Sequence, residues 1–299
     1  MIKLLIGGSP CTFWSVAQNK NKRETKAEGL GWELFLNYVI AKEKFQPDYF
    51  LYENNWSASK EIKEQIQEEL NCKLMRINSN LVSAQNRDRF YVFNWDVEQP
   101  EDRGILLKDI VQKVDEKTEY CYTLKSKNIK GKNALNKFRL SKKTLFEKSN
   151  CLTTCCLSAT NASNTTVLYD DGQIYKLTPI ECERLQTLPD NYTKGICNTQ
   201  RAKAIGNGWT AEVIIHILNG VLKDVPKDEK IIVLSMYDGI GTGRYCLDKM
   251  GFTNIEYHAY EIDKYAIQVA MHNYPDIIQH GDAFQVRNEN WTIGGNKNE

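Results

Sequence analysis

Residues that could bind a nucleoside cofactor stand at the ends of three predicted strands in the C-terminal part of the chain. The apolar run 231–236 leads directly into Asp238-Gly-Ile-Gly-Thr-Gly243, a glycine turn that opens a helix. Backbone N–H groups at such a turn can bind a negative ligand group, although a strand–turn–helix is often only a tight connection. Glu261 ends the next strand, where a carboxylate can bind ribose hydroxyls, and Asp282 follows a third strand, where it could accept from an adenine amino group. Each acid alone could equally cap a helix, but the three strand ends together predict a nucleoside cofactor at one edge of a sheet.

A cysteine, an acid and two arginines nearer the N-terminus could carry out group transfer. Cys11 follows Pro10 on the loop after a predicted strand, where a thiol is held rigidly and can stay accessible. Glu53 also follows a strand, and Gln85-Asn-Arg-Asp-Arg89 presents two arginines. Each has a plainer interpretation, because most cysteines outside disulfides are buried and inert, an acid can cap its loop, and alternating arginines usually lie on a solvated surface.

Strands and helices alternate around these residues, which predicts an α/β fold with much parallel pairing. The pattern predicts strands at 3–6, 49–52, 90–93 and 231–236, and helices at 32–42, 59–70, 178–188 and 199–222. Between about 96 and 170 the alternation fades, so this part is expected to form an irregular subdomain. Residues 223–230 form a short polar linker, and residues 288–299 a polar tail.

The composition is that of an ordinary globular protein, with 41% hydrophobic and 26% charged residues in a chain of 299. No apolar run approaches the roughly 20 residues that span a bilayer, and the N-terminus lacks the pattern of a signal peptide. The nine cysteines form neither a regular pairing framework nor paired Cys-x-x-Cys ligand sets. These features favour a reducing cytosol and argue against a metal site.

The formal net charge of +1 hides an uneven distribution of charge. Residues 121–150 contain nine basic residues and one acid, Glu147, which gives this segment a charge of +8. Such a block is most often a solvated surface, so alone it is weak evidence for nucleic-acid binding. The residues in it that we expect to reach phosphates, if nucleic acid binds, are Lys125, Lys127, Lys130, Lys132 and Arg139.

Taken together, the motifs resemble those of the DNA (cytosine-5) methyltransferases. The Pro-Cys loop, Glu53-Asn54 and the Gln-x-Arg-x-Arg element occur in the order typical of that family. They are followed by 177–192, which resembles the family's helix and Leu-Gln-x-Phe-Pro-Asp segment, and by Ala204-Ile-Gly-Asn-Gly-Trp209, which resembles its Gly-Asn motif. The resemblance covers most of the chain, leaving out chiefly 96–150 and the C-terminal tail.

Three positions depart from the family pattern. Asn55 replaces the usual Val after Glu-Asn, Leu188 stands where Phe is typical, and Gly208-Trp209 follows Gly-Asn where Ser-Val is commoner. None of these departures removes a group that the chemistry needs.

The order of the motifs is also unusual. In most of the family the cofactor motifs precede the Pro-Cys loop, whereas here they lie at 237–282, after the Gly-Asn motif. The resemblance therefore implies a circularly permuted member, in which the 223–230 linker joins the family's usual termini. The expected fold is a Rossmann-like S-adenosylmethionine-dependent methyltransferase sheet with helices on both faces, plus a small irregular target-recognition domain. The expected division is 1–95 for the first part of the catalytic domain, 96–194 for target recognition and 195–299 for the second catalytic part.

The resemblance implies transfer of a methyl group from S-adenosylmethionine to C5 of a flipped-out cytosine in a short duplex DNA site. Cys11 would add to C6, Glu53 would hold the N3 edge, and Arg89 with Arg87 would support the O2 side and the adjacent backbone. The implied cofactor contacts are Pro10, Tyr237, Asp238, Gly239, Ile240, Gly241, Thr242, Gly243, Glu261, Ile262, Asp282, Ala283, Asn207, Gly208 and Trp209. Besides the five basic residues, the implied DNA contacts are Ser9, Gln85, Thr153 and Thr154.

Three other functions compete with this interpretation. A tRNA cytosine-5 methyltransferase of the same fold is the nearest, and the basic segment favours duplex DNA over it. An inactive DNA-binding paralogue would be expected to have lost Cys11, Glu53 or the glycine turn, and a dehydrogenase would leave the Pro-Cys loop unexplained. We expect a monomeric, cytoplasmic, nucleoid-associated enzyme of a bacterial or phage-infected cell, with a cognate restriction endonuclease as a candidate partner and without metal or membrane. The sequence does not give the recognised bases, because base readout depends on folded loop geometry.

Overall fold

The computed structural model describes residues 1–16, 20–116, 141–157, 165–169 and 174–291. They form two compact units, one comprising Met1–Ile77, Asp88–Gln99 and Ile215–Glu299, the other Asn78–Arg87 and Pro100–Ile214. This division differs from the expected boundaries, since it assigns 78–87 and 195–214 to the second unit. The expected phosphate contacts lie outside the described residues: Lys125, Lys127, Lys130, Lys132 and Arg139.

The first unit is built on a seven-stranded sheet with the strand order β10-β9-β8-β1-β2-β4-β3. In chain order the strands are β1 (Ile2–Gly7), β2 (Tyr49–Asn55), β3 (Leu74–Asn78), β4 (Asp88–Phe93), β8 (Ile231–Met236), β9 (Ile255–Tyr260) and β10 (Ile278–Gln279). Pairing is parallel from β10 through to β2, and β4 runs antiparallel to β2. The carboxyl ends of five strands therefore meet at one edge, where ligands bind in open α/β sheets.

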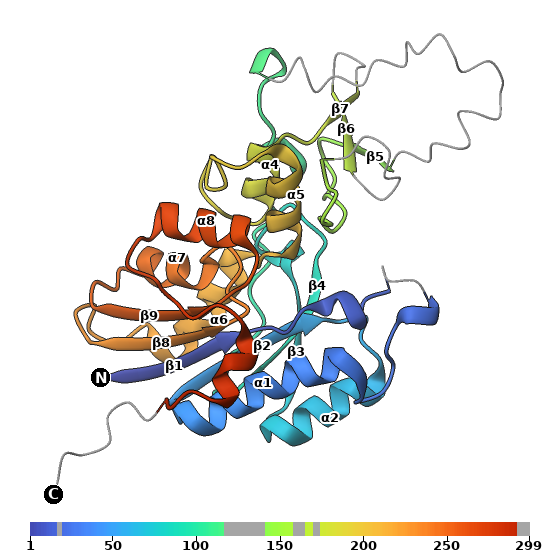
Figure 1. The fold of residues 1–299 in the computed structure, drawn as a ribbon. Coiled ribbons are helices and arrows are strands. Elements are labelled where there is room, and N and C mark those ends of the chain that lie inside the picture. The colour runs from blue at the N-terminus through green and yellow to red at the C-terminus, as the bar shows by residue number, and fades with distance from the viewer. Residues whose placement is uncertain (17–19, 117–140, 158–164, 170–173, 292–299) are drawn as a thin grey trace, which may run out of the picture. The chain divides into compact units, whose positions relative to one another are not determined.

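Helices cover both faces of this sheet (Figure 1), as the sequence predicted. One face carries α1 (Gly29–Phe45), α2 (Lys60–Leu70) and the 3-10 helix η6 (Ala283–Arg287), and the other carries α6 (Ala211–Leu222), α7 (Thr242–Lys249) and α8 (Lys264–Asn273). The expected α/β class is thereby confirmed.

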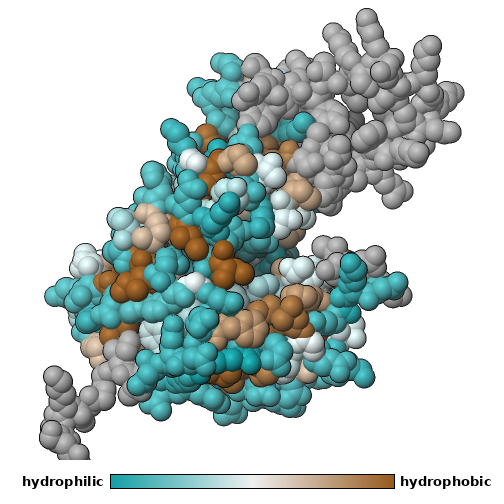
Figure 2. Space-filling view, viewed as in Figure 1, coloured by the Kyte–Doolittle hydropathy of each residue, from teal (hydrophilic) through white to brown (hydrophobic). Residues whose placement is uncertain are grey.

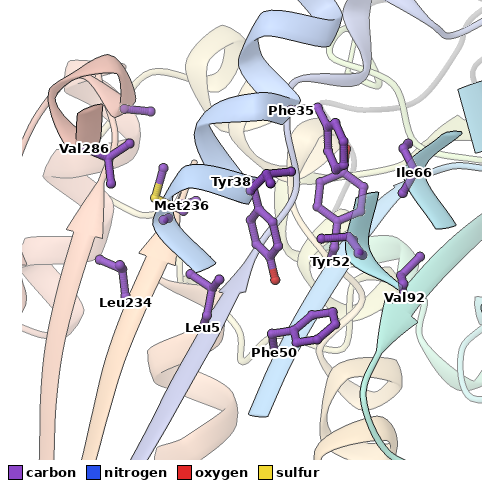
Figure 3. Close-up of a cluster of buried hydrophobic side chains, with 14 of the residues drawn as sticks. Leu5, Phe35, Tyr38, Phe50, Tyr52, Ile66, Val92, Leu234, Met236 and Val286 are labelled. Carbon is purple, nitrogen blue, oxygen red and sulfur yellow. The ribbon is translucent and has the colours of Figure 1, made fainter. Parts of the chain in front are cut away.

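An aromatic core joins α1 to the middle of the sheet. Figure 3 shows side chains of α1 facing those of the strands, and the ring of Tyr52 in β2 lies 5.2 Å from that of Phe35 and 5.0 Å from that of Tyr38. All three side chains are fully buried. Edge-to-face aromatic packing of this kind adds to the stabilisation from burial alone, so the end of β2 is held firmly.

Three elements differ from those predicted. Strand β3 was missed, and β10 ends at Gln279 rather than at Gly281. The single helix expected at 199–222 is two helices, α5 (Asn198–Asn207) and α6, because Gly208 leaves helical geometry with ψ at 169°.

The second unit contains a three-stranded sheet of β5 (Ser141–Thr144), β6 (Thr165–Leu168) and β7 (Ile174–Lys176). Helices α4 (Pro179–Leu185) and α5 contribute Cys182, Leu185, Ala202 and Ile205 to its own small hydrophobic core. Thr178 and Glu181 form a capping box at the start of α4. Helices α4 and α5 start within one residue of the predicted helical segments, and the described part of the expected irregular subdomain at about 96–170 contains the short strands β5 and β6.

Hydrophilic side chains predominate on the face of the molecule in Figure 2, and apolar residues form separate small patches there. Among the described helices, none combines the length and the apolar character that crossing a membrane requires.

Candidate active site

The loop that carries Cys11 begins in the middle of the sheet. Gly7 at the end of β1 pairs with Tyr52 of β2 on one side and Met236 of β8 on the other. A Cβ at Gly8 would lie 2.4 Å from the carbonyl oxygen of Glu53 and 3.1 Å from its Oε2. Glycine is thus required for the loop to approach Glu53 this closely. Cys11 is half-buried and opens the 3-10 helix η1 (Cys11–Phe13).

Glu53 and Arg89 form an ion pair between neighbouring antiparallel strands. The Arg89 Nε lies 3.0 Å from Glu53 Oε1, and the two side chains are only 9% and 13% exposed. The pairing of β2 with β4 brings them together, since Asn55 stands opposite Arg89 and Glu53 opposite Tyr91. The structure therefore holds a carboxylate of fixed orientation beside the loop that carries the thiol.

Ser9, Tyr52 and Asn54 form a buried hydrogen-bonded cluster under the same loop. Ser9 Oγ lies 2.8 Å from the Tyr52 hydroxyl, and Asn54 Nδ2 donates to Ser9 O at 2.9 Å and to the Tyr52 hydroxyl at 3.0 Å. Burial holds the pKa of Tyr52 well above its ordinary value, so this hydroxyl is neutral. The Ser9 side chain is 3% exposed and bonded inside the unit, and its expected DNA contact stays a prediction. Tyr52 and Asn54 were not among the predicted site residues, although Asn54 directly follows Glu53 in the motif.

The glycine turn after β8 adopts a backbone that few side chains allow. Tyr237, Gly239 and Gly241 have φ values of 61°, 65° and 75°. A Cβ at Gly243 would lie 2.3 Å from Ile6 Cδ1, so α7 can start against β1 only with glycine there. The positive φ of Tyr237 is stabilised by its hydroxyl, which donates to Leu34 O at 2.7 Å.

Asp238 lies beneath this turn with one carboxylate oxygen bonded and the other without a partner. Its Oδ1 accepts from Ser235 Oγ at 2.7 Å and from the Tyr257 hydroxyl at 2.6 Å. Its buried Oδ2 meets no hydrogen-bond partner within the described part of the chain. Burial raises the pKa of Asp238 to about 6, although the hydrogen bonds from Tyr257 and Ser235 act in the opposite direction.

The carboxylate of Glu261 accepts hydrogen bonds from a backbone N–H group of the glycine turn and from two that follow β9. Its Oε2 accepts from Gly239 N at 2.8 Å, and its Oε1 accepts from Ile262 N and Asp263 N at 2.8 Å each. A pyrophosphate placed at this turn would meet the carboxylate and be repelled, whereas ribose hydroxyls or a cationic group would be attracted. The side chain of Ile262 is 73% exposed, so an apolar surface lies next to the acid.

The residues after β10 are less distinctive. Asp282 caps η6, with its Oδ1 accepting from Phe284 N at 2.9 Å, and Ala283 is buried in the core. The Asp282 carboxylate is nevertheless exposed and keeps capacity to accept further hydrogen bonds. Within the described residues, no group of His, Cys, Asp and Glu side chains could hold a metal ion.

In the second unit, Gln85 and Arg87 are interior residues. Gln85 is fully buried, and its amide bonds to Leu185 O, Gln186 Oε1 and Leu152 N. The Gln85 amide is therefore already hydrogen-bonded inside the unit, and its expected DNA contact stays a prediction. Arg87 is 4% exposed and donates to Leu152 O, Gly206 O and Gly208 O, the last at 2.7 Å. These bonds explain why 78–87 belongs to the second unit.

Arg87 joins the 151–154 segment to the Gly-Asn motif, which lie about 50 residues apart in the sequence. A Cβ at Gly206 would lie 2.4 Å from the carbonyl of Thr153, so α5 packs directly on the 151–154 backbone. Thr154 and Asn207 are exposed, and Thr153, Gly208 and Trp209 are half-buried. The Thr-containing element and the Gly-Asn motif thus form one continuous part of the second unit.

A model of the family described as C-5 cytosine-specific DNA methylase matches residues 1–150 and 96–223. The chain belongs to this family. The resemblance found in the motifs is thereby confirmed, and membership of a methyltransferase family implies use of S-adenosylmethionine.

Relatives of this family member were found by sequence and by structure. The DNA (cytosine-5)-methyltransferase DRM2 of Oryza sativa subsp. japonica is 33% identical over 80 residues, which make up 27% of this chain and 13% of that protein. The solved structure of the Entamoeba histolytica methyltransferase EhMeth aligns with a TM-score of 0.53 and 14% identity, covering 75% of this chain and 78% of that chain. A structure of the S. pombe Dnmt2 methyltransferase aligns with a TM-score of 0.49 and 17% identity, over 72% and 78% of the two chains.

Proposed function

We propose that this chain methylates C5 of a flipped-out cytosine in duplex DNA, with Cys11 as the nucleophile. The observation that carries the proposal is the half-buried thiol on a loop whose Gly8 lies against Glu53, while Glu53 is paired with Arg89. A nucleophile and an oriented acid at the end of adjacent parallel strands suit covalent activation of a ring.

The proposed mechanism assigns one role to each of these side chains. C5 of cytosine is a poor nucleophile, so Cys11 Sγ first adds to C6, and this addition makes C5 electron-rich. Glu53 holds the N3 edge of the base and stabilises the protonated intermediate, and Arg89 keeps the carboxylate in place while supporting the O2 side. S-adenosylmethionine, when bound, supplies the methyl group. Loss of the proton from C5 then releases Cys11 and restores the aromatic ring.

The turn after β8 supports the assignment of the cofactor. The carboxylate of Glu261 suits ribose hydroxyls, and the exposed Ile262 suits the face of a purine. Asp238 is proposed to hold the turn from beneath. Because Glu261 would repel a pyrophosphate, this geometry argues against the dehydrogenase alternative. The other proposed contacts are Pro10, Tyr237, Gly239, Ile240, Gly241, Thr242, Gly243, Asp282, Ala283, Asn207, Gly208 and Trp209.

The second unit is proposed to recognise the DNA target. Thr153 and Thr154 remain candidates for DNA contact, together with the basic segment that lies outside the described residues. We propose that Arg87 supports the 151–154 segment and the Gly-Asn motif and is not a catalytic group, because its guanidinium donates hydrogen bonds to three backbone carbonyls there. Gln85 supports the 151–154 segment as well, because its amide accepts from Leu152 N and donates to Leu185 O.

We also propose that the motif order is circularly permuted relative to most of the family. The family model matches residues up to 223 and leaves out 224–299, which hold the proposed cofactor strands. Strand β8 nevertheless pairs with β1 over its whole length, from Ile2 with Ile231 to Gly7 with Met236. A permuted order gives this combination of a late sequence position and a central place in the sheet.

The test is transfer of radiolabelled methyl from S-adenosylmethionine to unmethylated duplex DNA, by wild type and by Cys11→Ala, with bisulfite sequencing of the product. The proposal expects label at C5 in one short sequence context and none with the variant. A parallel assay with tRNA distinguishes the main alternative. Label in tRNA alone, or equal transfer by the variant, would overturn the proposal.

A further inference from the structure

The segment between Cys11 and α1 contains one acidic residue, Glu24, that contacts both of its ends. Strand β1 ends at Gly7 and α1 begins at Gly29, and the described residues between them, 8–16 and 20–28, contain two 3-10 helices but no strand. Glu24 is half-buried in this stretch, and its backbone N–H donates to Phe13 O at 2.9 Å. Residue 24 is therefore tied to the turn that starts at Cys11.

The carboxylate of Glu24 joins that turn to the first turn of α1. Its Oε2 accepts from the indole Nε1 of Trp14 at 3.2 Å, and its two oxygens lie 3.1 and 3.2 Å from Gly31 N. We call this carboxylate, with Trp14 Nε1 and Gly31 N, the Glu24 bridge. The N-cap residue of α1, Glu28, makes no side-chain capping bond, so Glu24 serves as the cap from outside the helix. A negative charge is favourable at this end of a helix.

The two glycines at the start of α1 are explained by the same carboxylate. A Cβ at Gly29 would lie 2.6 Å from Glu24 Oε1, and one at Gly31 would lie 2.5 Å from Oε2 and 2.8 Å from Trp14 Nε1. Gly29 also has a φ of 83°, a left-handed backbone that favours glycine by itself. Glycine normally weakens a helix, so at Gly31 it indicates that room for this contact outweighs the loss.

Trp14 carries the effect of the bridge to the nucleophile. Its side chain is fully buried and packs near Trp32 of α1, with ring centroids 6.5 Å apart. Its backbone N–H donates to Cys11 O at 3.1 Å, which closes the short turn on which the thiol sits. A shift of Trp14 would therefore shift Cys11.

Arg23 ties the same turn to the strand that bears Glu53. Its Nε donates to Trp14 O at 3.0 Å, and its Nη2 donates to Ser57 O, four residues after Glu53. Two contacts of neighbouring residues add to this, since Val16 N donates to Ser57 Oγ at 3.2 Å and Asn55 Nδ2 to Ser15 Oγ at 3.3 Å. The nucleophile turn is thus fixed both to α1 and to the loop after β2.

We infer that Glu24 is a positioning residue, which holds Cys11 at the place from which its thiol attacks C6. The inference rests on the proposed function for the nature of the reaction. The contacts of the Glu24 bridge are independent of it.

Two variants disturb the bridge in different ways. Glu24→Gln removes the charge and leaves one acceptor for two donors. Gly31→Ala keeps Glu24 but places a Cβ 2.5 Å from its Oε2 and 2.8 Å from Phe13 Cβ, so it displaces the carboxylate and presses on the turn after Cys11. Alanine also has the higher helix propensity, so Gly31→Ala does not weaken α1 through its backbone. Glu28→Gln is the matched control, because it removes the same charge from an exposed residue that makes no capping bond.

The first measurement is the single-turnover rate of methyl transfer to duplex DNA at saturating S-adenosylmethionine. We expect Glu24→Gln and Gly31→Ala each to slow transfer about tenfold, with cofactor affinity unchanged and Glu28→Gln at the wild-type rate. The double variant should be no slower than the slower single variant, because both act on one contact. Transfer by Glu24→Gln at the rate of Glu28→Gln, or a loss of cofactor affinity equal to the loss of rate, would overturn the inference.

The second measurement needs no methyl transfer, so it separates failure of this inference from failure of the proposed function. Iodoacetamide alkylation of Cys11, followed by mass spectrometry of the peptide, reports how firmly the turn is held. Both bridge variants should be alkylated at least roughly threefold faster than Glu28→Gln, because the turn opens more often. Equal alkylation in all three variants would overturn the inference even if wild type methylates no substrate.

Discussion

Removing the charges of the Glu53–Arg89 ion pair should affect the stability and the activity of the protein differently. Both side chains are largely buried, so Glu53→Gln should remove the opposite charge that Arg89 faces and lower the free energy of unfolding by about 3 kcal/mol. Removing both charges in Glu53→Gln/Arg89→Met should recover part of that loss while activity stays absent. Urea unfolding of the two variants measures this.

The ion pair of Arg76 and Asp88 in the same unit is the control. The side chains of that pair are 55% and 29% exposed, so Asp88→Asn should cost much less than Glu53→Gln. A double variant less stable than Glu53→Gln would contradict the argument, because it would mean that Arg89 stabilises the fold without its acid.

The buried carboxyl of Asp238 should make stability depend on pH. Burial raises its pKa to about 6 from an ordinary value of 3.8, so protonation favours the folded state. The contribution of this residue is complete below about pH 4 and is lost as the pH rises through about 6. Relative to Asp238→Asn, which cannot titrate, wild type should lose about 3 kcal/mol of unfolding free energy over the whole titration, of which about 2 kcal/mol falls between pH 4 and pH 6. Urea unfolding at several pH values measures the difference, and a constant difference would show that this carboxyl does not titrate in that range.

Which site residues could be predicted depended on what fixes their position. Cys11 follows a strand that is clear in the sequence, Glu53 lies near the end of a second such strand, and the parallel pairing of the two strands brings these ends together. Ser9 and Gln85 looked equally available, because a polar side chain gives no sign in the sequence of whether its partners lie inside the protein. Glu24 could not be predicted at all, since its partners Trp14 and Gly31 meet it only after the segment folds back.

At the level of elements, the contact of α5 with the 151–154 segment should be sensitive to a single methyl group. Gly206→Ala would place Cβ 2.4 Å from the carbonyl of Thr153, so the helix must move away from that segment. We expect a loss of about 2 kcal/mol in unfolding free energy, with weaker binding of duplex DNA. Thr199→Ala, at an exposed position of the same helix, should stay within about 0.5 kcal/mol of wild type. Equal stability of the two variants, measured by urea unfolding, would contradict the close packing.

The elements that were mispredicted share a physical cause. Strand β3 is a five-residue edge strand whose side chains are mostly half-buried, so its apolar residues do not alternate clearly. Helices α5 and α6 read as one because Gly208-Trp209-Thr210 contains no proline, and the break is made by hydrogen bonds from Arg87 and Gln186 to Gly208 O. Contacts distant in sequence decided both, whereas β8 and the glycine turn were predicted from local pattern alone.

At the scale of the whole molecule, the sheet and the chain follow different orders. The chain starts in the centre of the sheet at β1, builds one side through β2, β3 and β4, and returns after the second unit to build the other side. Ile2 N donates to Lys230 O at 2.8 Å, so the start of the chain lies beside the linker that precedes β8. The order of the strands in the sheet is thus independent of the order in which they are synthesised.

A rearranged chain tests this directly. Trp291 packs on Phe45 with ring centroids 6.2 Å apart, and Lys3 Nζ lies 4.8 Å from the same Phe45 ring, so the end of the described chain is near β1. Residues 292–299 can span up to about 26 Å, enough to join Glu299 to Met1. A permutant opened between Lys223 and Asp224 should therefore fold, bind S-adenosylmethionine and transfer methyl at about the wild-type rate, because every strand keeps its neighbours.

The same join opened between Val233 and Leu234 is the control, and it should not fold, because the cut divides the fully buried strand β8. Circular dichroism and the methyl-transfer assay compare the two permutants. If the chain opened at 223 also failed to fold, the native order of synthesis would be essential to the fold, and a permuted ancestry would lose its main physical support. If it folds and retains the sequence context mapped by bisulfite, recognition and catalysis depend only on the finished sheet and the second unit.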